Sequence, residues 1–382
     1  MNNNKINNNK VNNFALLLVS PLSVMSSTIL TAVIPYIAIH FQDVAYAKLL
    51  SQLILSIPYL SIALFAPFVY HIVNFFGKKK TFIYALIYVA LLGALTGLLD
   101  NLYLIVVARF FFGFGIATIS SIFLSLVGDY FEMHSRNIFL GYQSSFAFLM
   151  GAVFTMLGAW VGEYSWQYSF YLFLVILLVA FTSVLFLKFP KSQTKRRRPF
   201  QFKLFKNNFS IFFFAFLLKL IFFIFPTQIP FLLLDKGLEN YIGVVLSLLL
   251  VFAVISSFMY GYISKKISLN SLLVTVLLLK AISYFSIAVA TSIVPILMAT
   301  VLSGTATGLL HIIFVKYLLD KIPQQDRLSG TSILISTMHF GFFLSPIALY
   351  PLISTFNVAF SFLVASVILV ASSLYIYIKK LS

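Results

Sequence analysis

Long hydrophobic stretches, separated by short polar clusters, run through almost the whole chain. A helix needs about 20 apolar residues to cross the hydrocarbon core of a bilayer. Cutting at the polar clusters gives twelve such stretches, at residues 14–39, 47–73, 81–99, 102–127, 138–162, 167–188, 209–234, 242–263, 271–291, 294–319, 328–352 and 357–378. Strand-like alternation is rare in them, so the pattern predicts an all-α integral membrane protein with twelve transmembrane helices.

The composition narrows the class of protein further. Hydrophobic residues make up 61% of the 382 residues and charged residues only 9%, whereas soluble domains carry about 25% charged residues. There is no cysteine, which excludes disulfides and thiol chemistry. The sequence contains no nucleotide-binding loop, no Ser/His/Asp set and no metal-ligand cluster. We therefore expect neither an enzyme nor a cofactor, and the net charge of +17 does not indicate nucleic-acid binding because the basic residues alternate with the spans.

Basic residues outside the spans fix the predicted orientation. Of the 26 Lys and Arg residues, all but Lys48, Arg109, Lys219, Lys236 and Lys280 fall on one side of this topology. That side is expected to be cytoplasmic, and it holds both termini. We expect a multi-pass monomer in the cell (inner) membrane, in contact with lipid. Its predicted parts are a disordered tail (1–13), a six-helix bundle (14–188), a cytoplasmic linker (189–208) and a second six-helix bundle (209–382).

The two halves carry similar signals. A glycine and basic cluster follows the second span of each half, at residues 77–80 and at residues 261–266. Two six-helix halves related by duplication are typical of secondary transporters, whose binding site lies near the midplane where the repeats meet. The pattern therefore predicts two pseudo-symmetric bundles and a transport function.

Several short motifs occur in a characteristic order, at residues 25–41, 71–79, 109–115, 129–136, 151–162 and 165–170. Together they resemble the major facilitator superfamily, in particular its twelve-helix efflux branch of the drug:proton antiporter type. Arg109, Gly113 and Gly115 match the R-x-x-x-G-x-G motif of the fourth helix. The loop after helix two departs from G-x-x-x-D-R-x-G-R/K-R/K, because Asn74 replaces the aspartate.

The resemblance implies a set of gating residues on the cytoplasmic side, namely Asn74, Gly77, Lys78, Lys79, Asp129 and Arg136. Asn74 can form hydrogen bonds but carries no charge, so the latch it contributes is expected to be weaker than that of the family. The fifth-helix motif also departs from the family pattern, with Ala159 where a proline is usual. In this fold, helices one, four, seven and ten line the pathway, which places Lys219 there.

All nine acidic residues lie outside the hydrophobic stretches, whereas several basic residues lie within them. Charge inside a bilayer costs roughly 3 kcal/mol on insertion scales and is usually retained for function. The candidate substrate-binding residues are Arg109, Lys219, His339 and Lys280, and the candidate proton-coupling residues are His339 and His311, because imidazole titrates near neutral pH. A membrane site that offers cations and no carboxylate is suited to an anion.

Each of these residues also has a structural interpretation. Arg109 would brace the fourth helix against the first, and Lys219 would bond to carbonyls of a helix broken by Pro226 and Pro230. His339 would be a packing residue. Lys280 lies in a span that is peripheral by analogy, so it either faces inward as a ligand or stays neutral.

The predicted function is secondary active export of a small organic anion, such as a carboxylate-type siderophore or metabolite, coupled to a proton or other ion gradient. A broad-specificity drug efflux antiporter and an uptake carrier for an anionic nutrient are the alternatives. A sensor or an intramembrane enzyme is disfavoured, because the sequence has no soluble output domain and no catalytic set.

The charge pattern makes a topology prediction. Reporter fusions at Lys80 and Arg198 are expected to read cytoplasmic, and a fusion at Asp100 is expected to read external, because the basic loops stay inside. The reverse reading at any of the three sites contradicts the topology.

Overall fold

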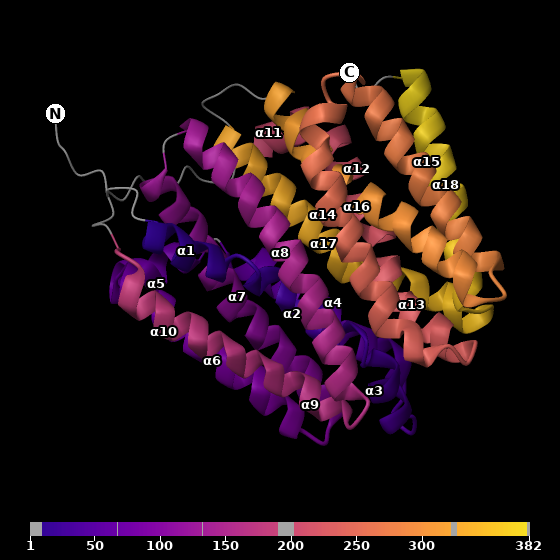
Figure 1. Cartoon of the computed structure of the whole chain (residues 1–382), viewed down its shortest axis with the longest axis horizontal. Coiled ribbons are helices and arrows are strands. Elements are labelled where there is room, and N and C mark those ends of the chain that lie inside the picture. Colours follow the sequence, from indigo (N-terminus) through magenta and orange to yellow (C-terminus); the bar gives the residue numbers. More distant parts are fainter. Residues whose placement is uncertain (1–9, 67, 132, 190–201, 322–326, 380–382) are drawn as a thin grey trace. The chain divides into compact units, whose positions relative to one another are not determined.

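The computed structural model describes residues 10–66, 68–131, 133–189, 202–321 and 327–379. Every regular element in these ranges is a helix (Figure 1), and twelve helical segments are long and apolar enough to cross a membrane. The all-α fold with twelve spans is therefore confirmed. The chain divides into two compact units, residues 1–37 with 43–195 and residues 38–42 with 196–382, and six of the candidate spans belong to each.

Ten α-helices and two short 3-10 helices are described between residues 10 and 189, and all lie in the first unit except the end of α3 from residue 38, which belongs to the second. The α-helices are α1 (Lys10–Val19), α2 (Leu22–Thr31), α3 (Ile34–His40), α4 (Ala47–Phe65), α5 (Val69–Phe76), α6 (Lys78–Leu95), α7 (Leu102–Tyr130), α8 (Met133–Gly162), α9 (Trp166–Tyr171) and α10 (Ile176–Phe186). The 3-10 helices, Thr96–Leu98 and Leu172–Val175, continue α6 and join α9 to α10.

The second unit contains α11 (Phe202–Asn207), α12 (Phe209–Phe222), α13 (Ile224–Asp235), α14 (Ile242–Ile263), α15 (Leu269–Val289), α16 (Ile293–Lys321), α17 (Arg327–Thr355) and α18 (Val358–Lys379). A 3-10 turn, Glu239–Tyr241, precedes α14. In this unit α15 packs along α16 and α18, α14 packs along α16, and α12 packs along α17.

The polar N-terminal tail ends earlier than the sequence predicts. The sequence predicts a disordered tail that includes residues 10–13, whereas these residues form the first turn of α1 and the side chain of Asn12 is buried. Adding a turn to an existing helix costs less free energy than nucleating a new helix. The helix formed by the apolar residues that follow can therefore extend backwards to include residues 10–13. Residues 1–9 and 190–201, to which the rest of the tail and most of the linker were assigned, lie outside the described ranges.

Two spans are broken next to proline. The first is divided into α1, α2 and α3, with Pro21 after the first break, and the seventh is divided into α12 and α13 at Phe223. Proline has no N–H, so the carbonyl four residues earlier loses its usual donor. A lipid environment cannot supply that donor, and the protein must do so.

Side chains replace the missing backbone donors. The hydroxyl of Ser20 donates to the carbonyl of Leu17, four residues before Pro21, at 2.7 Å. At the other break, the hydroxyl of Tyr284 donates to the carbonyls of Ile221 and Phe222 at 2.9 and 3.3 Å, and Phe222 lies four residues before Pro226. The carbonyls freed by Pro21 and Pro226 thus each have a donor from the protein.

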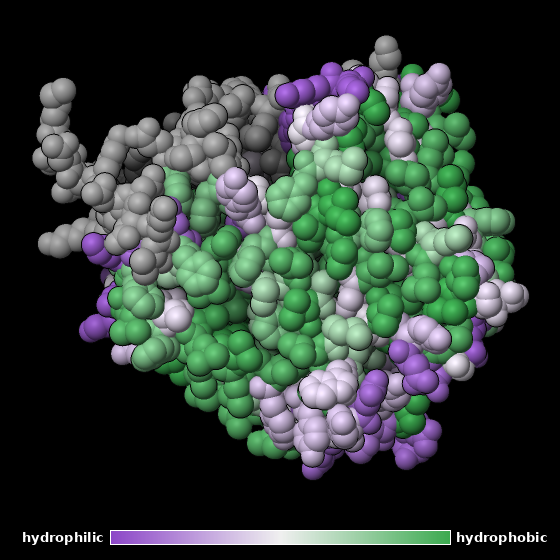
Figure 2. Space-filling model, viewed as in Figure 1, coloured by the Kyte–Doolittle hydropathy of each residue, from purple (hydrophilic) through white to green (hydrophobic). Residues whose placement is uncertain are grey.

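The outward sides of the helices carry large apolar residues. On α10, Leu178, Phe181 and Leu185 are exposed, whereas Ala180 and Ser183 are buried. Hydrophobic residues cover most of the helices on the viewed face (Figure 2). Such a surface suits lipid, and the chain is a multi-pass membrane protein.

Close helix contacts depend on small residues. A Cβ added at Gly158 on α8 would lie 2.1 Å from the carbonyl oxygen of Ile29 on α2. In the second unit, a Cβ at Gly308 on α16 would lie 2.2 Å from the carbonyl oxygen of Ala253 on α14. Neither obstacle is a flexible side chain, so each position accepts only glycine unless the helices separate.

We expect Gly158→Ala to lower the melting temperature of the purified protein, because its new methyl group meets backbone rather than a movable side chain. Overpacking of this kind typically costs about 1–3 kcal/mol. Gly141→Ala is the matched control, since Gly141 lies on the same helix and nothing lies within 4 Å of its added Cβ. The control should be neutral or slightly stabilising, and equal melting temperatures for the two variants would contradict the close packing.

Candidate functional site

Arg109 lies on α7 and is completely buried within the first unit. Its Nε donates to the carbonyl of Ile54 on α4 at 3.0 Å, and its Nη2 donates to the carbonyl of Ser26 on α2. Ile54 lies four residues before Pro58, so the guanidinium supplies the donor that this proline lacks. Arg109 thus ties together the helices of the first, second and fourth spans.

Aromatic rings complete the surroundings of this guanidinium. Its carbon lies 4.2 Å from the ring centre of Phe112 and 5.4 Å from that of Phe173, distances at which a cation is attracted to a ring face. Its Nη1 has no hydrogen-bond partner among the described residues. The observed contacts agree with the structural interpretation, in which Arg109 braces the fourth helix against the first. Substrate binding by Arg109 stays a prediction, and Nη1 is the atom that could make it.

Lys219 lies on α12, one turn before the break at Phe223, and its side chain is buried at 6% exposure. Its ammonium lies 5.4 Å from the ring centre of Phe342 on α17. Among the described residues it has no hydrogen-bond acceptor and no carboxylate partner. The carbonyls near the break are instead capped by hydroxyls, from Tyr284 and from Ser345, which donates to Leu220 at 2.8 Å.

Lys219 lies beside a close approach of α12 and α17. A Cβ at Gly341 would lie 2.6 Å from the carbonyl oxygen of Phe216 and 3.3 Å from the Cβ of Lys219. Phe342 also packs against Phe223, with ring centres 4.9 Å apart. The lysine is therefore positioned by packing rather than by an ion pair.

His339 lies one turn before Phe342 on α17 and belongs to the same cluster. The Nδ1 of its ring lies 2.7 Å from the carbonyl of Ile335, and the ring lies edge-on to Phe342 with centres 6.2 Å apart. A carbonyl only accepts, so Nδ1 carries the proton and Nε2 is the atom that gains or loses one. The positive charge of Lys219 acts on this histidine.

Lys280 lies on α15, fully buried, in the same unit. Its ammonium donates to the hydroxyls of Ser303 and Thr307 on α16, at 2.6 and 3.2 Å. It lies 4.4 Å from the ring centre of Phe222 and 5.0 Å from that of Tyr284. Phe222 lies at the end of the helix that carries Lys219, and Phe342 lies beside both Lys219 and His339, so aromatic contacts join Lys219, Lys280 and His339 in one cluster of the second unit.

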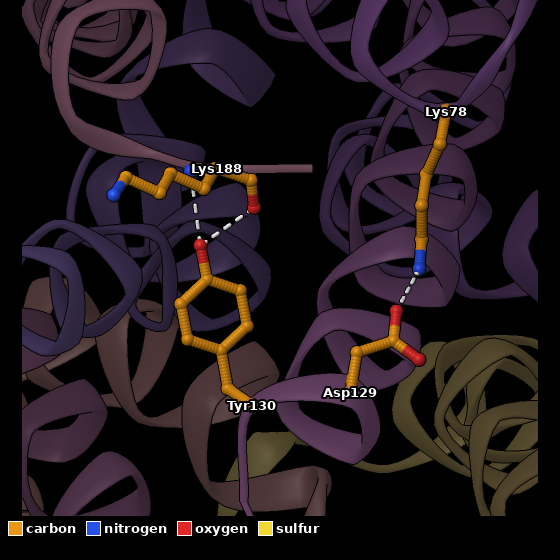
Figure 3. A network of polar contacts seen from close by, with 4 residues as sticks. All are labelled: Lys78, Asp129, Tyr130 and Lys188. Atoms are coloured by element: carbon orange, nitrogen blue, oxygen red, sulfur yellow. Dashed lines mark hydrogen bonds and ion pairs between the residues drawn. The ribbon is translucent and has the colours of Figure 1, made fainter. Parts of the chain in front are cut away.

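Two of the predicted gating residues, Lys78 and Asp129, meet at one end of the first unit (Figure 3). Lys78, at the start of α6, forms a salt bridge with Asp129 near the end of α7. The side chain of Lys78 is 7% exposed and that of Asp129 is 34% exposed, so the pair is shielded from solvent on one side. Gly77 begins α6 with a φ of +82°, a conformation that favours glycine.

The other predicted gating residues contribute differently. Asn74 is exposed, and neither its side chain nor that of the exposed Lys79 has a hydrogen bond or ion pair with the described residues. The ion pair of this region is thus made by Lys78, not at position 74. The side chains of Arg136 and His311 lie outside the described part of the structure.

A neighbouring contact was not predicted from the sequence. The hydroxyl of Tyr130, at the end of α7, donates to the carbonyl of Lys188 at 2.6 Å and accepts from its backbone N–H at 2.9 Å (Figure 3). It joins the end of the fourth span to the chain that leaves the sixth. In the sequence Asp129 stands out by its charge, whereas nothing distinguishes Tyr130 from the other tyrosines.

Sequence reasoning also missed the partners of the buried lysines. Ser303 and Thr307 are four residues apart on a hydrophobic span, which places them on one helical face, and that spacing is the signal that would have found them. Phe342 is one of 44 phenylalanines, so nothing in the sequence distinguishes it. Within the described residues, no group of three or more His, Asp and Glu side chains could hold a metal ion.

The twelve spans, divided equally between two units with cations embedded in both, define a polytopic membrane transporter. The chain matches the Major Facilitator Superfamily over residues 16–300 and 239–381, and it belongs to that family. No curated protein matches it in sequence.

Solved structures of this family share the fold. A mutant of the nucleoside transporter NupG superposes with a TM-score of 0.77 at 12% sequence identity, covering 96% of this chain and 99% of that chain. A bacterial homologue of the human lysosomal transporter Spinster, in an inward-facing and occupied conformation, gives a TM-score of 0.71 at 15% identity, covering 96% and 94%. Likeness at this identity shows the fold, and substrates do not follow from it.

Breaking the Lys78–Asp129 pair is expected to loosen this end of the first unit. The chain has no cysteine, so a single cysteine introduced at the buried Thr81 is the only thiol that can be labelled. Asp129→Asn in that background should raise the labelling rate several-fold, a change of about 1 kcal/mol or less in opening.

Lys79→Gln is the control for charge alone, because Lys79 is exposed and lies next to Lys78. It should leave the labelling rate unchanged. Lys78→Gln should match Asp129→Asn, and combining the two should add nothing further. A rate that is the same in Asp129→Asn and in the control contradicts a latch at this pair.

Proposed function

We propose that this protein is a secondary active transporter that moves a small organic anion across the cell (inner) membrane by alternating access, with both termini cytoplasmic. The observation that carries the proposal is the ammonium of Lys219, which is buried beside Phe342 without a carboxylate or hydrogen-bond acceptor among the described residues. A buried charge without a partner is unfavourable. Binding of an anion supplies the missing counter-charge.

The distribution of charge in the spans supports an anionic substrate. Each candidate span is free of acidic residues except at its ends, where Asp129, Asp235 and Glu239 lie. A carrier for lipophilic cations needs a negative group at membrane depth to offset the charge of its cargo. The second unit offers two lysines and a histidine instead.

The same cluster suggests a substrate class. Lys219 supplies a point charge with three donors, and Phe342 and Phe223 supply apolar surface beside it. A polycarboxylate or a similar organic acid with an apolar part, such as a carboxylate-type siderophore or metabolite, fits these groups. Arg109 is the second candidate ligand, through its unpaired Nη1.

The direction of transport is proposed from the resemblance to the efflux branch, whose glycine-rich fifth helix is matched by Gly151, Gly158 and Gly162. An uptake carrier for an anionic nutrient uses the same cations and is the second candidate. A drug:proton antiporter is the third, and the absence of acidic residues within the first span disfavours it. The nucleoside transporter and the Spinster homologue share the fold but contribute no argument for substrate.

The substrate proposal predicts a selective effect of Lys219→Gln. Cells that express the wild-type protein should move organic anions, and Lys219→Gln should reduce that transport at least tenfold, because the cation that offsets the substrate charge is lost. A tenfold change corresponds to about 1.4 kcal/mol. Lys219→Arg should keep part of the activity, since it retains the charge in a different shape.

Lys266→Gln is the matched control, because it removes an exposed lysine of the same unit whose ammonium contacts the side chain of Tyr262. Its transport of anions should equal that of the wild type. Strong transport of ethidium-like cations that persists in Lys219→Gln would overturn the proposal and favour the drug-efflux alternative. Measurements in vesicles with imposed pH gradients then fix the direction.

A further inference from the structure

Lys280 is the most deeply buried cation of the second unit, and it has no counter-ion among the described residues. Its exposure is 0%, and its hydrogen-bond partners are the hydroxyls of Ser303 and Thr307. Burying a charged ammonium without a carboxylate is costly. The rings of Phe222 and Tyr284, at 4.4 and 5.0 Å from Nζ, offset part of that cost when the amine is charged.

The two hydroxyls suit both charge states of this amine. Thr307 donates its own proton to the carbonyl of Ser303 at 2.8 Å, so its oxygen is fixed as an acceptor for Lys280. The hydroxyl proton of Ser303 has no acceptor among the described residues, and it lies 2.6 Å from Nζ. A charged Lys280 donates to both oxygens, whereas a neutral Lys280 donates to Thr307 and accepts from Ser303.

Lys280 is linked to Lys219 through the break in the seventh span. Phe222 ends α12 three residues after Lys219, and its ring contacts the ammonium of Lys280. Tyr284, one turn after Lys280 on α15, donates to the carbonyls at the same break. Both cations therefore border the same break, Lys219 one turn before it and Lys280 against the rings of Phe222 and Tyr284.

Few other titratable groups surround this amine. α12 brings Lys219, α15 itself brings Tyr284, and α17 brings His339, which interacts with Lys219. On α18, which packs along α15, the titratable residues are Tyr375, Tyr377 and Lys379, all in its last two turns. On α16 the side chains of His311 and Asp320 are outside the described residues, and Tyr317 hydrogen-bonds to Asn270. The described groups at membrane depth near Lys280 are therefore cationic or neutral.

We propose that Lys280, held by Ser303 and Thr307, is a proton-coupling residue that gains a proton when an anion binds at Lys219, so that the anion and the proton cross the membrane together. This inference rests on the proposed anion transport. The step is a simple protonation, in which the lone pair of the neutral amine takes a proton from the solution and releases it on the other side. No bond to the substrate forms or breaks.

The sign of the coupling follows from the charges. An anion at Lys219 cancels the repulsion that opposes a charge on Lys280, so anion binding favours proton binding. Linkage is reciprocal, so a proton on Lys280 raises the affinity for the anion by the same factor. Antiport requires the anion and the proton to compete for the transporter. Here each raises the affinity for the other, which corresponds to symport. Where the proton gradient points inward, this arrangement drives uptake, and it favours the second candidate direction over export.

The test measures protons taken up by the purified wild-type protein in weakly buffered detergent solution when citrate is added. Citrate is the probe because its carboxylates stay ionised above about pH 7, so its own charge does not change. We expect about one proton to be taken up per citrate bound, with binding measured separately by calorimetry. Citrate affinity should fall as the pH rises, by up to tenfold per pH unit, because the bound proton is lost.

Lys280→Met keeps a long apolar side chain and removes the titrating group. It should still bind citrate, but without proton uptake and with an affinity that no longer depends on pH. Ser303→Ala should keep coupling and shift its pH dependence, because the neutral amine loses its donor. Ser283→Ala is the control: it removes a nearby hydrogen bond between the same two helices, to the carbonyl of Ala299, and should behave as wild type.

Each outcome has a separate meaning. Citrate binding without proton uptake by the wild type overturns the coupling and leaves anion transport standing. Proton uptake that persists in Lys280→Met and disappears in His339→Gln also overturns it, and assigns the proton to the histidine. If neither citrate, malate, benzoate nor phosphate binds, the proposed anion transport fails, and the coupling fails with it. If Lys280→Met does not fold, the Ser303→Ala shift decides between coupling and a structural role.

Discussion

The cost of placing positive charge at membrane depth, in spans whose acidic residues lie only at their ends, governs this structure. The protein meets that cost in three ways. Arg109 donates to backbone carbonyls and lies against phenylalanine rings, and Lys280 donates to two hydroxyls among aromatic rings. Within the described part of the chain, Lys219 has one ring near its ammonium, that of Phe342, and no hydrogen-bond acceptor. The three cations therefore differ in how much binding free energy each could contribute to an incoming anion.

Proline connects this electrostatic problem to the fold. Each of three prolines frees a carbonyl, and a side chain donates to it: Ser20 from the same span donates to Leu17, and Arg109 and Tyr284 from other helices donate to Ile54 and Phe222. The Leu17 carbonyl also accepts the backbone N–H of Ser20 at 3.0 Å. Backbone groups at membrane depth need such donors, because lipid supplies none. The donors therefore allow bent and broken helices in the first, second and seventh spans, and a broken span is where Lys219 and Lys280 are brought near each other.

Sequence reasoning reached the twelve spans and the family because both depend on long, redundant signals. The embedded cations were visible for the same reason, since a lysine in a hydrophobic run is conspicuous. Their partners were less conspicuous: Phe342 is one phenylalanine among 44, Ser303 contacts Lys280 from the following span, and Tyr284 contacts Phe222 across 62 positions of the sequence. The bracing contacts of Arg109 depend on how α7 is aligned along α2 and α4. A hydropathy pattern does not predict that alignment.

The central claim is that Lys219 lacks a counter-charge and that an anion supplies it. Thermal unfolding of the purified protein, at equal ionic strength with citrate or with a tetraalkylammonium salt, tests this claim most directly, because a ligand that binds the folded state raises its melting temperature. The account predicts a rise with citrate that increases with concentration and disappears in Lys219→Gln, and no rise with the cation. A rise with the tetraalkylammonium ion, or a citrate effect that is unchanged in Lys219→Gln, would contradict it.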